Sequence, residues 1–224
     1  MFEYLKKAKN YWVSDTSFVT LLGMLFFTVF ILPVMINKEG ETTIFLNIMF
    51  IVLFFVGIFS AMEKRFLIAG ISLVSIHLLL RLIRFTDNPY EFYLLERIVI
   101  ILNLILLIVI NIRLLFRDME VNSYRVIGAV NVYLLLAVAG AFGFEIIQLL
   151  MGNSIGGDIE ISGMDVDFGD YMYFSLVSIS TIGFGDLYPV NMSSKMLSVF
   201  LSALGILYPA VVIAKLVSFA TEKK

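Results

Sequence analysis

A series of apolar segments, each about as long as a membrane is thick, constrains this chain most. A helix needs roughly 20 mostly apolar residues to cross the hydrocarbon core of a bilayer. Six segments are long enough, at residues 17–36, 43–62, 66–83, 97–116, 125–151 and 193–220. Composition agrees, because only 15% of the 224 residues are charged, against about 25% in soluble domains. We therefore expect an all-α membrane protein with six transmembrane helices.

The third and fourth segments are the least regular of the six. Their uncharged cores cover only Phe66–Leu80 and Ile98–Ile112. To complete these spans, the arginines at their ends would have to extend toward the membrane interface; they are Arg81, Arg84, Arg97 and Arg113. A seventh apolar stretch, Tyr171–Thr181, is too short to cross and fits a re-entrant helix.

The distribution of basic residues predicts the orientation, because cytoplasmic loops carry an excess of Lys and Arg. If the N-terminus is inside, the inner side holds Lys6, Lys7, Lys9, Lys64, Arg65, Arg113, Arg117, Arg125, Lys223 and Lys224. The outer side then holds Lys38, Arg81, Arg84, Arg97 and Lys195. We expect a multi-pass protein of the plasma membrane with both termini in the cytoplasm.

Composition also excludes several classes of function. The chain has no cysteine, which rules out disulfides and thiolate chemistry. Its net charge of −2 and scattered basic residues give no sign of nucleic-acid binding. No group of residues is arranged for catalysis or for holding a cofactor, so we do not expect an enzyme.

A nine-residue string lies between the last two segments: residues 178–186 read Ser-Ile-Ser-Thr-Ile-Gly-Phe-Gly-Asp. Within it, residues 181–186 resemble the selectivity filter of the potassium channel family. Such a filter replaces the water around a potassium ion with rings of backbone carbonyl oxygens, one set from each of four chains. Glycine at alternate positions, here Gly183 and Gly185, relieves the backbone strain that this arrangement imposes. The resemblance implies a homotetramer that conducts K⁺ passively, with ions bound at Thr181, Ile182, Gly183 and Phe184.

The same resemblance implies supports for the filter. Residues 173–181 have the length of a re-entrant pore helix, whose C-terminal dipole would face the conducted cation. Tyr173 and Phe174 stand where the family often has a pair of tryptophans. Asp186 stands where relatives have an aspartate that bonds behind the filter. Its partner here is therefore either Tyr173 or Phe174.

Two further features concern gating and ion entry. Gly205 and Pro209 in the last segment predict a hinge, although both residues are also common in plain membrane-helix packing. An acidic outer loop would raise the cation concentration at the pore mouth, or would simply be solvated; its members are Asp158, Glu160, Asp165, Asp167 and Asp170. The spacing at Asp165, Asp167 and Asp170 fits no ordered calcium loop. Glu145, near the end of the fifth segment, needs a buried partner, which we expect among backbone or hydroxyl groups.

The chain divides into a four-helix block at residues 1–118 and a pore domain at residues 119–224. The block resembles the voltage-sensor arrangement of six-helix channels, in which arginines repeat every third residue of the fourth helix. Stepping by three from Arg97 reaches Ile100, Asn103, Leu106, Val109 and Ile112, none of them charged. We therefore predict weak or no voltage dependence. We also expect the amides of Asn103 and Asn111 to bond to neighbouring helices. For His77 we expect a structural role with its ring nitrogens hydrogen-bonded, and a proton-sensing role stays open.

Two other classes of protein stay open. A poorly selective monovalent cation channel has a similar filter. A secondary transporter or structural membrane protein is the second alternative, although a transporter has paired broken helices in two repeated halves, which this chain lacks. Beyond K⁺ and the bilayer, a separate regulatory subunit could act on the gate.

Overall fold

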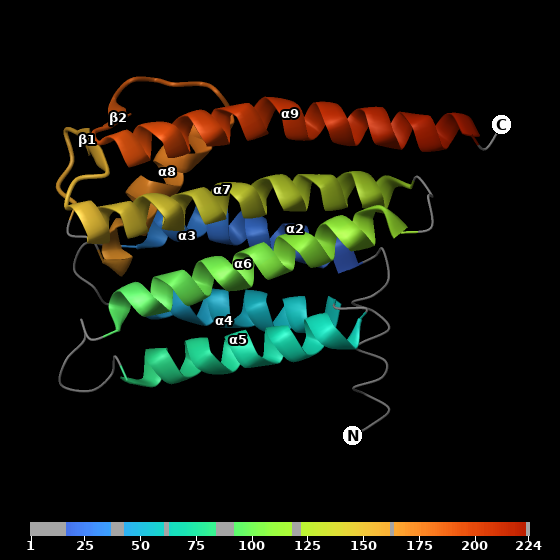
Figure 1. Cartoon of the computed structure of the whole chain (residues 1–224), viewed down its shortest axis with the longest axis horizontal. Coiled ribbons are helices and arrows are strands. Elements are labelled where there is room, and N and C mark those ends of the chain that lie inside the picture. Colours follow the sequence, from blue (N-terminus) through green and yellow to red (C-terminus); the bar gives the residue numbers. More distant parts are fainter. Residues whose placement is uncertain are drawn as a thin grey trace.

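The computed structural model describes residues 17–36, 43–60, 63–83, 92–117, 122–161 and 164–222. These residues form long helices that lie side by side, with α9 and α5 on opposite sides of the row (Figure 1). In chain order the elements are α2 (Ser17–Phe26), η1 (Phe27–Ile31), α3 (Leu32–Met35), α4 (Thr43–Ser60), α5 (Lys64–Ile83), α6 (Tyr93–Leu115), α7 (Ser123–Met151), β1 (Ile155–Gly157), η3 (Asp165–Asp167), α8 (Phe168–Ile179), β2 (Leu187–Pro189) and α9 (Met192–Glu222).

Five helical segments are long and apolar enough to cross a membrane: Ser17–Met35, Lys64–Ile83, Tyr93–Leu115, Ser123–Met151 and Met192–Ser218. In α4 the apolar part within the searched residues is the shorter Phe45–Gly57. The structure therefore has the helices of a membrane protein. Arg84 and the basic residues of both chain ends lie outside the described residues, as does Lys38.

The first segment is continuous but changes its helical pitch. Five residues of π-helix, Phe27–Ile31, separate α2 from α3. Pro33 lies at the start of α3, and a proline lacks the N–H that would bond to the carbonyl four residues earlier, with which its ring also clashes. The wider π turn relieves that conflict.

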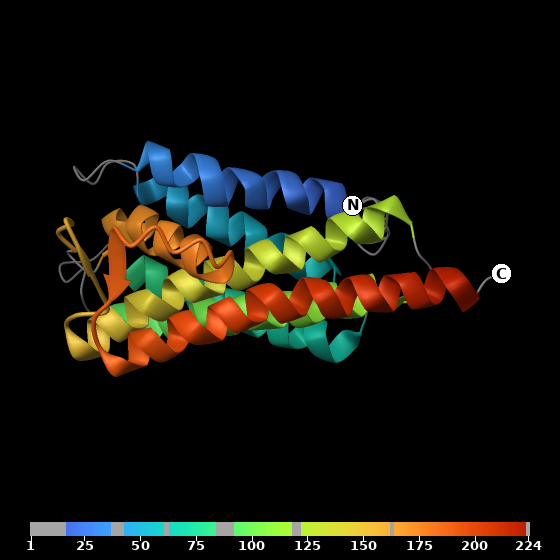
Figure 2. The same ribbon diagram turned by 90° about the horizontal axis from the view of Figure 1, so that it is seen from above.

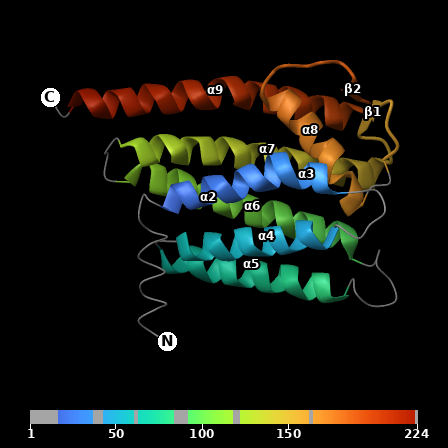
Figure 3. The ribbon, with the colours of Figure 1, turned by 180° about the vertical axis from the view of Figure 1, so that it is seen from behind.

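The short helix α8 lies between α7 and α9 and does not cross the molecule. Its 12 residues extend about 18 Å, less than the roughly 30 Å of a hydrocarbon core. The chain leaves α7 through β1 and returns through β2, and these strands pair antiparallel with Ile155 opposite Pro189. The chain therefore enters α8 and leaves the loop that follows α8 at the same end of the molecule (Figures 1 and 3). This is the geometry of a re-entrant loop.

The block packs on α7 of its own chain. Both α2 and α6 run along α7, while α9 packs on another side of it (Figure 2). Asn131 in α7 donates from Nδ2 to the carbonyl oxygen of Phe18 in α2, at 2.8 Å. One core of buried apolar side chains extends from α2 to α9, so the block and the pore helices share a single hydrophobic interior.

Candidate functional site

The filter segment, defined as Thr181–Gly185, begins where α8 ends. Thr181, Gly183 and Gly185 have φ values of 59°, 58° and 86°, so alternate residues lie in the left-handed region. A Cβ added to Gly183 or Gly185 would meet nothing within 4 Å. The backbone conformation, rather than lack of space, therefore calls for glycine at these two positions. Thr181 adopts the same conformation despite its Cβ, which the sequence did not indicate.

Of the two candidate partners for Asp186, the structure brings Tyr173 to it. The Tyr173 hydroxyl donates to Oδ2 of Asp186 at 2.6 Å. This hydrogen bond favours the ionised carboxylate and so lowers the pKa of Asp186 below its ordinary value. Phe174 points elsewhere: it is buried and packs against Phe144 of α7, with ring centroids 4.8 Å apart.

The C-terminal end of α8 is held by groups that sequence reasoning missed. A helix leaves its last carbonyl oxygens without helical partners. Ser202 of α9 donates to the carbonyl oxygen of Ser178 at 2.9 Å, and the Tyr133 hydroxyl of α7 donates to that of Ile179 at 3.2 Å. The only signal was the presence of hydroxyl groups within apolar helices. These bonds fix the end of α8 from which the filter segment starts.

Gly205 is a packing residue at this same end. A Cβ on Gly205 would lie 1.6 Å from the carbonyl oxygen of Ile179, far inside van der Waals contact. Helix α9 continues without interruption through Gly205 and Pro209. The close contact with Ile179 supports the packing interpretation of Gly205, and the hinge at Gly205 and Pro209 stays a prediction.

The five acidic residues predicted to lie at the outer mouth divide into two sets. Asp158 and Glu160 are exposed and, with the half-buried Asp170, line one surface groove. Asp165 and Asp167 are buried, which corrects their assignment to an open vestibule. Within the described ranges, no group of three His, Cys, Asp or Glu residues could hold a metal ion.

A buried set of ion pairs explains why Asp165 is buried while Asp158 and Glu160 are exposed. We name it the outer charge cluster, and its members are Arg81, Glu96, Arg97, Glu145 and Asp165. All five side chains are buried. Arg81 and Arg97 therefore do not extend to the interface as predicted, because they have carboxylate partners inside the protein.

Glu145 has partners of two kinds. It accepts from Nε of Arg97 at 2.9 Å and from the Tyr93 hydroxyl at 2.6 Å. A hydroxyl partner was expected, but the arginine from the block was not. Sequence reasoning missed it because the pairing joins residues 48 positions apart.

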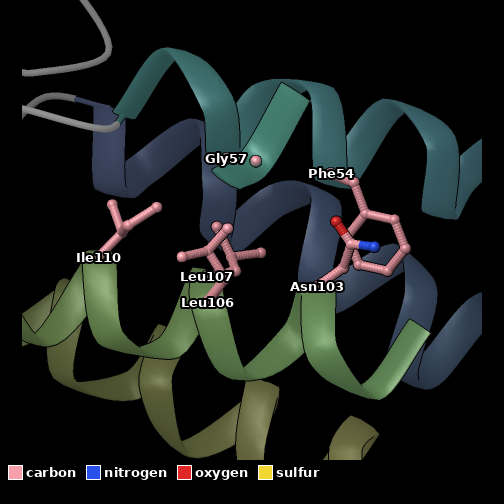
Figure 4. Close-up of a pocket in the computed structure, with 7 residues that line it drawn as sticks. Phe54, Gly57, Asn103, Leu106, Leu107 and Ile110 are labelled. Carbon is pink, nitrogen blue, oxygen red and sulfur yellow. The ribbon is translucent and has the colours of Figure 1, made fainter. Parts of the chain in front are cut away.

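Away from this cluster, mostly apolar side chains of α4, α5 and α6 fill the interior of the four-helix block. A cavity there is lined by Phe54, Gly57, Gly70, Asn103, Leu106, Leu107 and Ile110, most of which Figure 4 labels. Asn103 and Asn111 each donate to the carbonyl oxygen four residues earlier in α6, at 2.9 and 2.8 Å. These amide donors thus stay within their own helix instead of reaching a neighbouring one. His77 packs edge-on to Phe54, with ring centroids 5.6 Å apart. Among the residues that the structure describes, neither of its buried ring nitrogens has a hydrogen-bond partner, which corrects the expectation that they would be hydrogen-bonded.

Comparisons with known proteins concern the part of the chain that contains this site. Residues 130–222 match the family model described as "Ion channel", a range that contains α8, the filter segment and α9 as well as most of α7. The Potassium channel K2 of Plasmodium falciparum is 53% identical over 30 residues, which are 13% of this chain and 2% of that protein. The chain thus spans a very small part of this relative's length. No solved structure gives a significant match.

The fold and the family match together support an ion channel in a membrane. They indicate a channel and not an enzyme.

Proposed function

We propose that this chain is one subunit of a homotetrameric potassium channel that conducts K⁺ passively through the filter segment. One observation carries the proposal: glycines at alternate left-handed positions directly follow a short re-entrant helix. A ring of carbonyl oxygens needs several copies of such a strand around one axis, and four copies suit K⁺. K⁺ would bind at Thr181, Ile182, Gly183 and Phe184.

The surface of α9 supports assembly with other copies. Large apolar side chains on this helix are exposed in the single chain, among them Val199, Phe200, Ile206, Leu207, Val211 and Ile213. Lipid or a neighbouring subunit can cover such a surface. Since the filter segment needs copies around one axis, we assign part of this surface to contacts between subunits.

The remaining features complete the proposed channel. It crosses the plasma membrane six times with both termini in the cytoplasm. The five long apolar helices supply five of these spans, and the shorter α4 supplies the other. Asp158, Glu160 and Asp170 attract cations to the outer mouth. A separate regulatory subunit is a proposed partner at the gate.

Flux through purified protein in liposomes tests this function. With a potassium gradient, we expect K⁺ flux that barium blocks and that Gly183→Ala abolishes, because alanine strains the left-handed backbone at φ 58°. Gly152→Ala is the matched control: Gly152 also has a left-handed φ, 83°, and open space around it, but it caps α7 outside the filter. Equal flux of sodium and potassium would assign the chain to the poorly selective channels. Loss of flux in both variants alike would remove the argument for the filter.

A further inference from the structure

The outer charge cluster joins the block to the pore loop, which the proposed conduction mechanism does not require. Its arginines come from the block, Arg81 near the end of α5 and Arg97 in the first turns of α6. Two of its carboxylates come from the pore domain: Glu145 on α7 and Asp165 on η3. Four elements, two from the block and two from the pore domain, thus meet in one buried site.

Asp165 is the member nearest the filter along the chain. Both arginines donate to it: Arg81 to Oδ2 at 3.3 Å through each terminal nitrogen, and Arg97 to Oδ1. Element η3, which starts at Asp165, leads directly into α8. The arginines of the block therefore hold the chain immediately before the first turn of the pore helix.

An aromatic contact holds the same turn. Phe168, the first residue of α8, packs against Phe50 of α4 and Phe142 of α7, with ring centroids 5.8 Å away in each case. The guanidinium of Arg97 lies over the Phe142 ring, 5.5 Å from its centroid. The charges and the rings thus form one continuous contact between the block and the start of α8.

The other end of α8 meets α7 and α9 through Ser178 and Ile179. A helix of three turns is stiff on this scale, so a shift of its first turn moves its last turn and the filter segment with it. Such a shift would separate buried charges from their partners, which is strongly unfavourable. The position of α8 is therefore fixed at both ends.

We propose that Arg97, assisted by Arg81, is a positioning residue for ion selection: it fixes the pore helix to the block through Asp165. The block is then a static scaffold for the filter rather than a moving sensor. This inference rests on the proposed function only in that ion selectivity is one of its two readouts.

The test compares assembled tetramers of the wild type, Arg97→Gln, Asp165→Asn, the double variant and Arg97→Lys. The first readout is the K⁺/Na⁺ permeability ratio from reversal potentials. The second is hydrogen exchange of the α8 amides, which needs no conduction. Arg113→Gln is the matched control, because Arg113 also lies on α6 and pairs with a carboxylate, that of Glu63, but in an exposed position.

We expect Arg97→Gln and Asp165→Asn each to lower the permeability ratio at least about fivefold and to speed exchange in the first turn of α8 about tenfold. The double variant should lose less than the sum of the two single losses, since the ion pair between Arg97 and Asp165 is removed by either change alone. Arg97→Lys should recover part of each loss, and Arg113→Gln should match the wild type.

Wild-type values of both readouts in assembled Arg97→Gln would overturn the proposal. If Arg97→Gln does not assemble, Asp165→Asn and Arg97→Lys decide by the same criteria. If the wild type shows no ion selectivity, the proposed function fails, but α8 exchange still decides: faster exchange in Asp165→Asn supports the positioning role, and unchanged exchange contradicts it.

Discussion

At the scale of single residues, the hydrogen bond from Tyr173 to Asp186 is the contact closest to the filter that the structure adds. It uses a phenol where the family resemblance implies a tryptophan. The residue type at position 173 was readable from the sequence, but the choice between Tyr173 and Phe174 was not. That choice depends on which face of α8 turns toward Asp186, and hence on the packing of Phe174 against α7.

Removing this hydroxyl should weaken the filter at any pH at which Asp186 is ionised. The pKa of Asp186 is below its ordinary value. The hydrogen bond from Tyr173 to the ionised carboxylate is therefore fully present at pH values above the ordinary pKa of an aspartate, and is lost only as the pH falls through the lowered pKa. We therefore expect wild-type K⁺ flux to be unchanged between external pH of about 7.5 and about 5. Tyr173→Phe should give flux that decays faster at every pH in this range, because the bond is absent while Asp186 stays ionised.

Tyr188→Phe is the control for this prediction, because Tyr188 is an exposed tyrosine on the nearby strand β2. Flux through liposomes at controlled external pH provides the measurement. Identical decay in Tyr173→Phe and Tyr188→Phe would show that the hydrogen bond does not support the filter.

At the scale of elements, the apolar segments predicted the helices but not where they begin. The fourth segment was predicted from residue 97, whereas α6 begins at Tyr93, and the pore helix from residue 173, whereas α8 begins at Phe168. Both helices start among charged residues, which an apolar pattern assigns to loops. Their charges are tolerated because Arg97 and Asp165 pair with each other. Such pairing depends on tertiary contacts that no local pattern contains.

The contact between α9 and α8 gives a prediction at this scale. Gly205→Ala would place a Cβ 1.6 Å from the Ile179 carbonyl oxygen, and neither backbone can yield cheaply. We expect the tetramer to lose stability and K⁺ flux to fall at least about tenfold, because overpacking moves α9 away from the filter. Size-exclusion chromatography and flux assays measure the two effects.

Gly23→Ala is the corresponding control, since a Cβ at Gly23 of α2 meets nothing within 4 Å. A hinge role for Gly205 predicts another outcome: an assembled channel whose open probability changes while its stability does not. That result would contradict the packing account.

At the scale of the whole molecule, the four-helix block lacks the charges that a voltage sensor needs. A working sensor moves about three to four charges per subunit across the field. Every third position of α6 after Arg97 is uncharged, and Arg113 in the last turn lies outside this register. Arg97 itself is bound to Glu145 and Asp165. We therefore expect a conductance that varies little with voltage. Recordings over a wide voltage range check this, and a steep conductance–voltage relation would contradict it.

The block also lies beside the pore helices of its own chain, and only residues 116–122 connect α6 to α7. We propose that the tetramer keeps this arrangement without exchanging blocks between subunits. The chain has no cysteine, so Phe116→Cys and Lys215→Cys can be combined cleanly. The Lys215 ammonium lies 4.3 Å from the centroid of the Phe116 ring. A short thiol crosslinker should therefore give linked monomers on a denaturing gel, whereas crosslinked dimers would indicate exchange.

The most direct test of the central claim is the reversal potential with K⁺ on one side of the membrane and Na⁺ on the other. Each tenfold preference for K⁺ shifts this potential by about 59 mV. We predict a shift of at least about two such steps for the wild-type tetramer. A reversal potential near zero would contradict the proposal that the filter segment selects potassium.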